Sequence, residues 1–250
     1  MSKIEARVAL VTGGTRGIGE SISRGLARDG AKVVAVCNSH RDHAMEFAEK
    51  VKAEEGYDID IRQGNVGNPA DCQRIVDEIA ADYGRLDYLV NNAGIVRDRT
   101  AVKMQLLDFD QVMKVNLYGP FFMAKAALPH FFDAGFGRIV NISSFVGETG
   151  RVGQANYAAS KSGLFGLTKT LALETAGKGI TVNCVIPGAI ETEMSGSLPP
   201  EILQAVIDMV PMKAMGTGDD IAAAVRFFCS DEAKYVTGAL LPVAGGLLMM

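Results

Sequence analysis

The chain has 250 residues, 48% hydrophobic and 22% charged, which is ordinary for a globular protein and sufficient for one α/β domain. Its net charge of −4 gives no general attraction for nucleic acid or an anionic membrane surface, and no stretch approaches the roughly 20 apolar residues of a membrane span. There is no signal-peptide pattern, and the four cysteines are scattered without metal-ligand spacing, so we expect a cytoplasmic protein with reduced thiols and no bound metal.

Short apolar runs alternate with longer helical patterns along the chain. The predicted strands are 8–11, 32–37, 59–63, 88–91, 138–142, 181–186 and 240–243. The predicted helices are 17–29, 40–55, 69–83, 107–133, 155–177 and 218–230. This alternation is typical of a doubly wound α/β fold, in which helices cover both faces of a parallel sheet. We expect a single domain over 1–250, with a mobile substrate lid at about 189–212, where Met, Ser and Pro are frequent.

A glycine-rich turn, TGGTRGIG, joins the first predicted strand to the first predicted helix. Glycines let the backbone approach a pyrophosphate, and the helix start offers free N–H groups and a positive dipole end. This position predicts a dinucleotide site, with a purely structural tight turn as the alternative. The candidate binding residues of the turn are Gly13, Thr15, Arg16, Gly17, Ile18 and Gly19.

The end of the second predicted strand bears on which dinucleotide binds. NAD sites place a carboxylate there to accept a hydrogen bond from the ribose 2′-OH. This chain has Asn38 and no acid, while Arg16 in the turn could pair with a 2′-phosphate. We therefore expect NADP(H), with Asn38 among its contacts. The alternative is that Arg16 and Arg41 are solvated surface charges.

Tyr157 and Lys161 stand four residues apart on a predicted helix, so their side chains share one face. A neighbouring cation lowers the pKa of a phenol, which makes it usable as a proton donor or acceptor near neutrality. Ser144 precedes Tyr157 by thirteen residues and could hold the substrate oxygen. Ser143 is the rival hydroxyl, which the alternation along 139–144 disfavours. Taken alone, the Tyr–Lys pair could be a coincidence.

Further signatures follow in order along the chain: Asn65-Val66, Asn91-Asn92-Ala93-Gly94, Asn116 and Pro187-Gly188. With them the whole chain resembles the short-chain dehydrogenase/reductase family. The resemblance implies a seven-stranded sheet in which Tyr157 is the acid/base, Ser144 orients the carbonyl and Lys161 holds the nicotinamide ribose. Asn116 would anchor a relay water. The further cofactor contacts that the resemblance implies are Asn65, Val66, Asn92, Ala93, Gly94, Tyr157, Lys161, Pro187, Gly188, Ile190 and Thr192.

Pro120 suggests how a relay water could be held. Because proline has no N–H, it cannot bond the carbonyl of Asn116, four residues earlier. A helix through 117–122 would leave that carbonyl free to bind water at a kink. We expect Pro120 to help open the relay site, with a plain proline kink as the alternative.

Within the family, stretches such as NNAGIVRD, PGAIETEM and VAGGLLMM resemble the bacterial β-ketoacyl-thioester reductases. This resemblance implies NADPH-dependent reduction of a 3-oxoacyl thioester carried by acyl carrier protein or CoA, with no nucleic-acid or membrane partner. One alternative is a dehydrogenase of the same fold acting on a sugar, a steroid or a secondary alcohol. Another is a nucleotide-binding sensor or scaffold without turnover.

Some positions depart from the pattern of carrier-protein reductases. Gly135, Phe136 and Leu173 stand where basic residues for an acidic carrier are usual. Ala189 replaces a common aromatic residue, which enlarges the acyl pocket unless a lid methionine fills it. Small residues and leucines on two faces of 155–177 predict pairing with 107–133 across a two-fold axis, and the resemblance implies a homotetramer. The remaining basic candidates for carrier docking are Arg97, Arg99, Lys103, Arg138 and Arg151.

Overall fold

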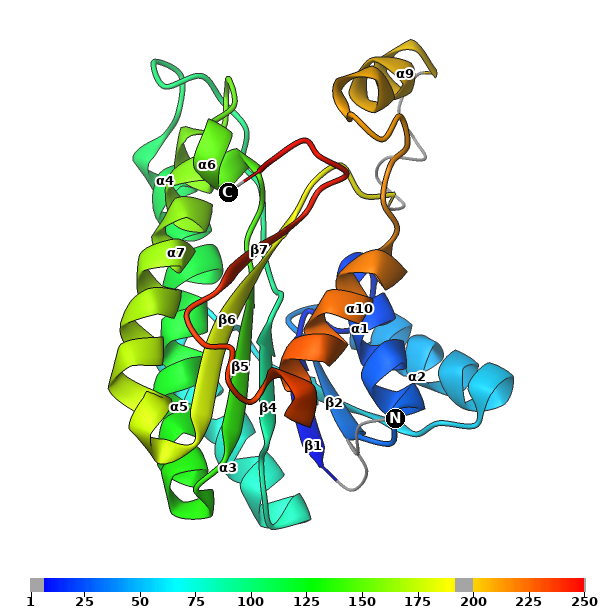
Figure 1. Ribbon diagram of the computed structural model, residues 1–250, viewed down its shortest axis with the longest axis vertical. Helices are drawn as coiled ribbons and strands as arrows, with labels where there is room; N and C mark the ends of the chain where they lie inside the picture. Colours follow the sequence, from blue (N-terminus) through cyan, green and yellow to red (C-terminus); the bar gives the residue numbers. More distant parts are fainter. Residues whose placement is uncertain (1–6, 192–199, 250) are drawn as a thin grey trace.

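The computed structural model describes residues 7–191 and 200–249, which form a seven-stranded parallel sheet between two layers of helices (Figure 1). The strand order is β3-β2-β1-β4-β5-β6-β7. The strands are β1 (Val8–Thr12), β2 (Lys32–Cys37), β3 (Ile59–Gln63), β4 (Tyr88–Asn91), β5 (Gly137–Ile142), β6 (Ile180–Pro187) and β7 (Leu240–Val243). The predicted fold class and the predicted strands are confirmed, with small differences at strand ends.

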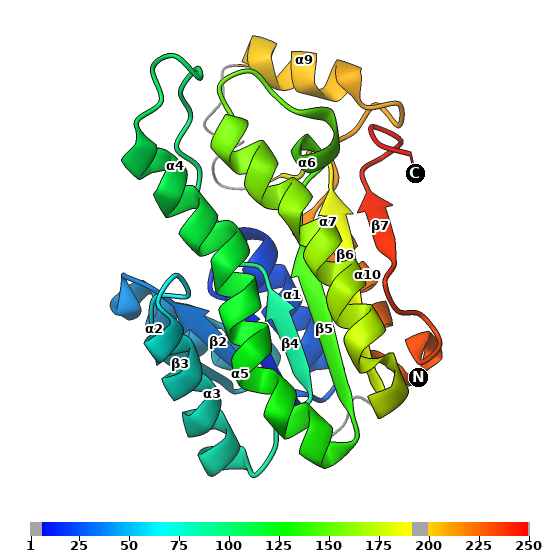
Figure 2. The same cartoon turned by 90° about the vertical axis from the view of Figure 1, so that its left-hand side faces the viewer.

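Helices α1, α2 and α10 cover one face of the sheet, and α3, α5 and α7 cover the other (Figures 1 and 2). On the first face lie α1 (Gly17–Arg28), α2 (Arg41–Glu55) and α10 (Gly218–Cys229). On the second lie α3 (Pro69–Tyr83), α4 (Leu106–Met113), the π-helix η1 (Lys114–Tyr118), α5 (Gly119–Ala134) and α7 (Ala155–Thr175). The short elements are α6 (Val146–Thr149), η2 (Ala176–Lys178), α9 (Pro200–Met209) and η3 (Asp231–Ala233).

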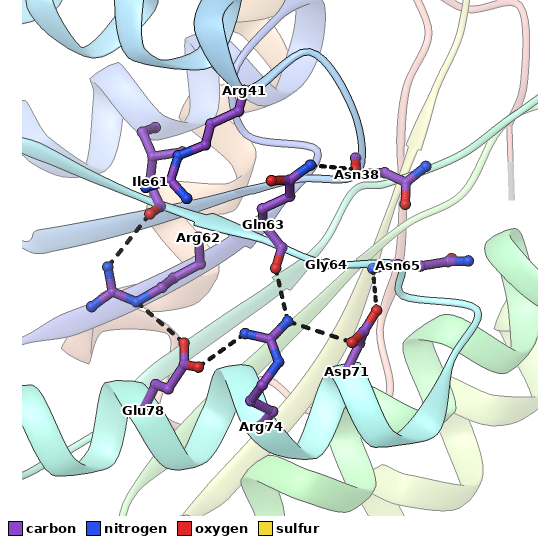
Figure 3. A pocket seen from close by; sticks show the side chains of 10 residues that line it. All are labelled: Asn38, Arg41, Ile61, Arg62, Gln63, Gly64, Asn65, Asp71, Arg74 and Glu78. Carbon is purple, nitrogen blue, oxygen red and sulfur yellow. Dashed lines mark hydrogen bonds and ion pairs between the residues drawn. The ribbon is translucent and has the colours of Figure 1, made fainter.

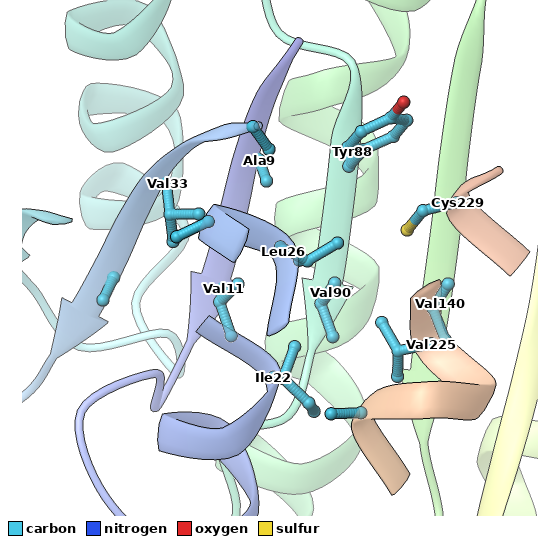
Figure 4. Close-up of a cluster of buried hydrophobic side chains, with 14 of the residues drawn as sticks. Ala9, Val11, Ile22, Leu26, Val33, Tyr88, Val90, Val140, Val225 and Cys229 are labelled. Carbon is cyan, nitrogen blue, oxygen red and sulfur yellow. The ribbon is translucent and has the colours of Figure 1, made fainter. Parts of the chain in front are cut away.

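The core under the first face shows why continuous apolar runs form the central strands. Ile22 and Leu26 of α1 and Val225 of α10 pack on Val11 of β1 and Val90 of β4 (Figure 4). All of these side chains are buried. Because helices cover both faces, successive residues of a central strand are buried in turn, and burial of their apolar surface is the main force holding the layers together.

The sheet topology creates one crevice at its carboxyl edge. β1 pairs with β2 on one side and with β4 on the other. The connection that follows β1 therefore leads to one side of this strand, and the connection that follows β4 leads to the other side. The loops after β1 and β4 therefore diverge at a topological switch point, where α/β sheets of this kind bind ligands. Thr12 and Asn91, the last residues of these strands, are register partners. The glycine-rich turn and the Asn92–Gly94 stretch thus begin side by side.

Two regions differ from the sequence-based expectation. The predicted single helix 107–133 is a run of three elements, with the π-helix η1 widened between α4 and α5. The lid region includes α9, which the sequence pattern did not reveal and which contains no buried side chain. Residues 192–199 lie outside the described residues, so the mobility of the lid stays a prediction.

Two further properties bear on the protein's surroundings. Within 7–191 and 200–249, no helix is both long enough and apolar enough to span a bilayer. All four cysteines are unpaired and buried, as expected from the apolar runs around most of them.

Candidate active site

The glycine-rich turn has the backbone conformation of a pyrophosphate cradle. Gly13 and Gly17 have φ of +62° and +52°, values that favour glycine. A Cβ added at Gly19 would collide with the carbonyl oxygen of Gly13 and lie 2.5 Å from the side-chain nitrogen of Asn92. Arg16, at the N-cap of α1, makes no side-chain hydrogen bond to the helix. The first N–H groups of α1 are thus available to an anion.

The turn is locked to the loop after β4 by a pair of polar side chains. The amide of Asn92 donates to the carbonyls of Thr12 and Gly13 at 3.1 and 3.0 Å. The Thr12 hydroxyl in turn accepts from the N–H groups of Asn92 and Ala93 at 3.0 and 3.1 Å. The Asn92 side chain, expected at the cofactor, therefore holds the turn in place. Sequence reasoning missed Thr12, although its position at the end of β1 is a usable signal.

A polar pocket of about 520 Å³ lies at the carboxyl ends of β2 and β3 (Figure 3). Asn38, Arg41 and Asn65 are among the residues lining it. Arg74 also lines the pocket, and its guanidinium nitrogen lies 2.9 Å from a carboxylate oxygen of Glu78. The positive charge of Arg74 is therefore already compensated. Of the residues predicted to contact the adenosine part of the cofactor, Asn38 and Asn65 line this pocket, whereas Arg16 and Val66 do not.

The predicted catalytic side chains converge where β5 meets α7. The ammonium of Lys161 donates to the carbonyl of Ile142 at 2.8 Å and lies 5.7 Å from the centre of the Tyr157 ring. The Ser144 hydroxyl accepts from the Val146 N–H at 3.3 Å and acts to lower the pKa of the Tyr157 phenol, so the two side chains lie near each other. The Ser143 hydroxyl instead donates to the carbonyl of Lys161 at 2.8 Å. Ser143 is thus engaged in structure, and Ser144 is the hydroxyl that faces the phenol.

Burial dominates the protonation equilibria of this pair. It lowers the pKa of Lys161 to about 8. Burial raises the pKa of Tyr157 above its ordinary value, and the hydrogen bond with Ser144 acts in the opposite direction. The expected lowering of the Tyr157 pKa by Lys161 is therefore wrong for this structure, because desolvation of the phenolate outweighs other effects.

Asn116 lies fully buried in the π-helix and uses its side chain to hold neighbouring segments. Its oxygen accepts from the Ile95 N–H at 2.8 Å, and its nitrogen donates to the Ile95 carbonyl at 3.0 Å. The same nitrogen donates to the Ser160 hydroxyl at 3.2 Å, and that hydroxyl donates to the carbonyl of Tyr157 at 2.8 Å. Pro120 follows the widened turn directly. The relay water on the Asn116 carbonyl stays a prediction.

Two other segments carry residues predicted to contact the nicotinamide. A Cβ on Gly94 would lie 3.5 Å from the Lys161 nitrogen, so this backbone passes close to the ammonium. Gly188 donates from its N–H to the carbonyl of Val243 at 3.0 Å, which fixes the end of β6. Pro187 and Ile190 flank it in described positions, and Thr192 lies outside the described residues.

This arrangement fits a nicotinamide dinucleotide. The turn leaves no room for a side chain at Gly19, the start of α1 presents N–H groups, and polar residues line the adenosine end. Among the described residues, no group of three or more His, Cys, Asp or Glu side chains is arranged to hold a metal ion.

Residues 13–248 match the family described as enoyl-(acyl carrier protein) reductase. The chain belongs to the short-chain dehydrogenase/reductase family. It is 45% identical to the acetoacetyl-CoA reductase of Allochromatium vinosum over 98% of this chain and 99% of the relative. It is 40% identical to 3-oxoacyl-[acyl-carrier-protein] reductase FabG of Aquifex aeolicus over 98% of both chains. Nodulation protein G of Azospirillum brasilense is 42% identical over 96% of this chain and 98% of its own length. As a member of this family, the chain is an oxidoreductase that uses a nicotinamide cofactor.

The structure also sorts the basic residues proposed for carrier docking. Arg138 is buried at the start of β5, the opposite end of the sheet from Tyr157, where its guanidinium donates to the carbonyls of Gly137 and Gly179. It is therefore no docking residue, and that expectation is wrong. The exposed candidates that remain are Arg97, Arg99, Lys103 and Arg151.

Proposed function

We propose that this protein reduces 3-oxoacyl thioesters to 3-hydroxyacyl thioesters with NADPH. The observation that carries the proposal is the convergence of Tyr157, Ser144 and Lys161 beside the dinucleotide crevice. The names of the relatives, an acetoacetyl-CoA reductase and a 3-oxoacyl-[acyl-carrier-protein] reductase, support this substrate class.

Each side chain has one task in this reaction. The bound cofactor supplies a hydride to the β-carbon of the substrate. The Ser144 hydroxyl donates to the substrate carbonyl oxygen and holds it next to the Tyr157 phenol, which transfers its proton to the developing alkoxide. Lys161 donates one N–H of its ammonium to the carbonyl of Ile142, so its two other N–H groups can donate to the ribose hydroxyls of the cofactor.

NADPH preference rests on the charge at the adenosine end. Asn38 stands where a carboxylate would accept from a ribose 2′-OH, and Arg16 and Arg41 are both exposed beside the crevice. A double variant, Arg16→Ala with Arg41→Ala, should lose affinity for NADPH by about tenfold or more while leaving NADH affinity little changed. An unchanged NADPH to NADH ratio would remove this assignment.

The carrier of the acyl group is phosphopantetheine, which CoA and acyl carrier protein share. Arg97, Arg99, Lys103 and Arg151 are exposed on two loops beside the start of α7. An N–H···O bond of 2.8 Å from Arg99 to Gly153 joins those loops. Arg97 lies 4.0 Å from the carboxylate of Asp108, and the four basic side chains outnumber Asp98 and Asp108 beside them, which suits the phosphates of this arm.

NADPH oxidation measured with acetoacetyl-CoA and with acetoacetyl carrier protein tests the proposal and ranks the two carriers. Turnover of neither, with turnover of a sugar or steroid instead, would overturn it in favour of another oxidoreductase of this fold. Binding of NADPH with no turnover of any carbonyl would favour a nucleotide sensor or scaffold.

We also propose a homotetramer that works in the cytoplasm. Tyr118 and Phe121, on η1 and α5, are partly exposed aromatic residues, and Leu173 of α7 is 85% exposed. Such apolar surface on adjacent helices favours pairing of subunits across a two-fold axis. Light scattering after size exclusion should give four times the chain mass, and a monomer would contradict the assembly.

A further inference from the structure

The loop after β4, residues 95–99, is held by hydrogen bonds from side chains of η1 and of the start of α7, the helix that carries Tyr157 and Lys161. Asn116 holds Ile95 through both backbone groups, as described above. Gln154, just before α7, donates to the carboxylate of Asp98 at 2.9 Å. A third fastening is made by Asn156, the residue immediately before Tyr157.

Asn156 joins three elements at one buried point. Its side chain is fully buried. The oxygen accepts from the Tyr157 N–H at 2.8 Å. The nitrogen donates to the carbonyl of Arg97 at 3.0 Å and to that of Asp108 in α4 at 3.5 Å. A single amide thus links the first turn of α7, the loop after β4 and α4.

We propose that Asn156 is a positioning residue, which sets the place of Tyr157 relative to the loop that borders the substrate crevice. The side-chain oxygen of Asn156 holds the backbone of Tyr157, and its side-chain nitrogen holds the loop and α4. A shift of one of these segments is therefore coupled to the other two. A phenol that transfers a proton within hydrogen-bond distance is sensitive to shifts of about 1 Å. The inference rests on the proposed function only for its kinetic readout.

The chain contains a matched control in Asn183 of β6. This amide is also fully buried and also bridges two backbone groups. Its nitrogen donates to the carbonyl of Val236 at 2.9 Å, and its oxygen accepts from the Ala239 N–H at 3.1 Å. Its side-chain hydrogen bonds join β6 to the segment before β7. The same substitution at Asn183 therefore reports the general cost of changing such an amide.

The test compares Asn156→Asp with Asn183→Asp. Aspartate keeps the volume and the acceptor, but it places a carboxylate oxygen against the carbonyls of Arg97 and Asp108. For Asn156→Asp we expect kcat with acetoacetyl-CoA to fall by about tenfold or more, with KM and the Kd for NADPH within about threefold of wild type. Amide hydrogen exchange across 95–99 should become faster in this variant alone. Asn183→Asp should keep kcat within about twofold.

Each result has one meaning. Equal exchange of 95–99 in the two variants, or a kcat within about twofold of wild type for Asn156→Asp, overturns the inference. An equal loss of kcat in both variants also overturns it, since the effect would then be one of stability. If Asn156→Asp fails to fold, Asn156→Ser takes its place with the same criteria. A wild type inactive on acetoacetyl-CoA contradicts the proposed function, while the exchange comparison still decides the role of Asn156.

Discussion

Substitution of Gly19 by alanine should damage the dinucleotide cradle. The new Cβ would collide with the Gly13 carbonyl and lie 2.5 Å from the Asn92 nitrogen, where roughly 3.5 Å is comfortable. The turn must therefore move by about 1 Å, which costs about 1–3 kcal/mol for overpacking. Loss of the two Asn92 hydrogen bonds adds about 0.5–1.5 kcal/mol each. Alanine has a higher helix propensity than glycine, which offsets about 1 kcal/mol of this cost. We therefore expect the free energy of unfolding to fall by about 1–5 kcal/mol in total.

The assay combines urea unfolding with a titration of NADPH fluorescence. Because the displaced turn no longer faces the pyrophosphate correctly, NADPH affinity should fall by about tenfold or more. Gly177→Ala in η2 is the control, since a Cβ there meets nothing within 4 Å. It should leave stability within about 0.5 kcal/mol of wild type. Wild-type NADPH affinity in Gly19→Ala would refute the reasoning about the cradle.

Three further predictions concern stability. Burial lowers the pKa of Lys161 from its ordinary 10.5 to about 8 in the folded protein. The cost of burying the charged ammonium therefore reduces the free energy of unfolding in full below pH 8, and this cost decreases as the pH rises to 10.5. Lys161→Met should therefore stabilise the protein at pH 7 and have little effect at pH 10.5, and a gain independent of pH would contradict this. Thr12→Val leaves the N–H groups of Asn92 and Ala93 without their acceptor, so the free energy of unfolding in urea should fall by about 2–4 kcal/mol. An unchanged free energy of unfolding would show that the Thr12 hydrogen bonds are not needed to hold the turn. Asp87→Ala leaves the buried Val8 N–H without its acceptor and releases the half-exposed Arg85, so unfolding should become easier by about 1–3 kcal/mol, and a loss below about 0.5 kcal/mol would contradict its role.

The strands and the meeting of Tyr157 with Lys161 were predictable because both depend on local pattern. A strand covered on both faces must be apolar throughout, and two residues one helical turn apart must share a face. A kink near Asn116 was predicted from Pro120, but its form as a π-helix was not, because the predicted pattern was that of one continuous helix. Helix α9 was missed because its surroundings are rich in Met, Ser and Pro.

Long-range contacts account for the other gaps. Asn156 bonds a carbonyl 59 residues away, and Thr12 bonds N–H groups 80 and 81 residues away, so only the assembled sheet reveals their roles. The direction of the Tyr157 pKa shift likewise depends on burial by the whole fold, which spacing along α7 does not report. Arg138 was misassigned for the same reason, because its burial follows from the packing at the start of β5.

Transfer of a proton from the Tyr157 phenol is the central claim, and removal of that one oxygen tests it most directly. Single-turnover oxidation of NADPH by acetoacetyl-CoA should slow by about 10²–10⁴-fold in Tyr157→Phe, while the Kd for NADPH stays close to that of wild type. Turnover by Tyr157→Phe at the wild-type rate would contradict the account.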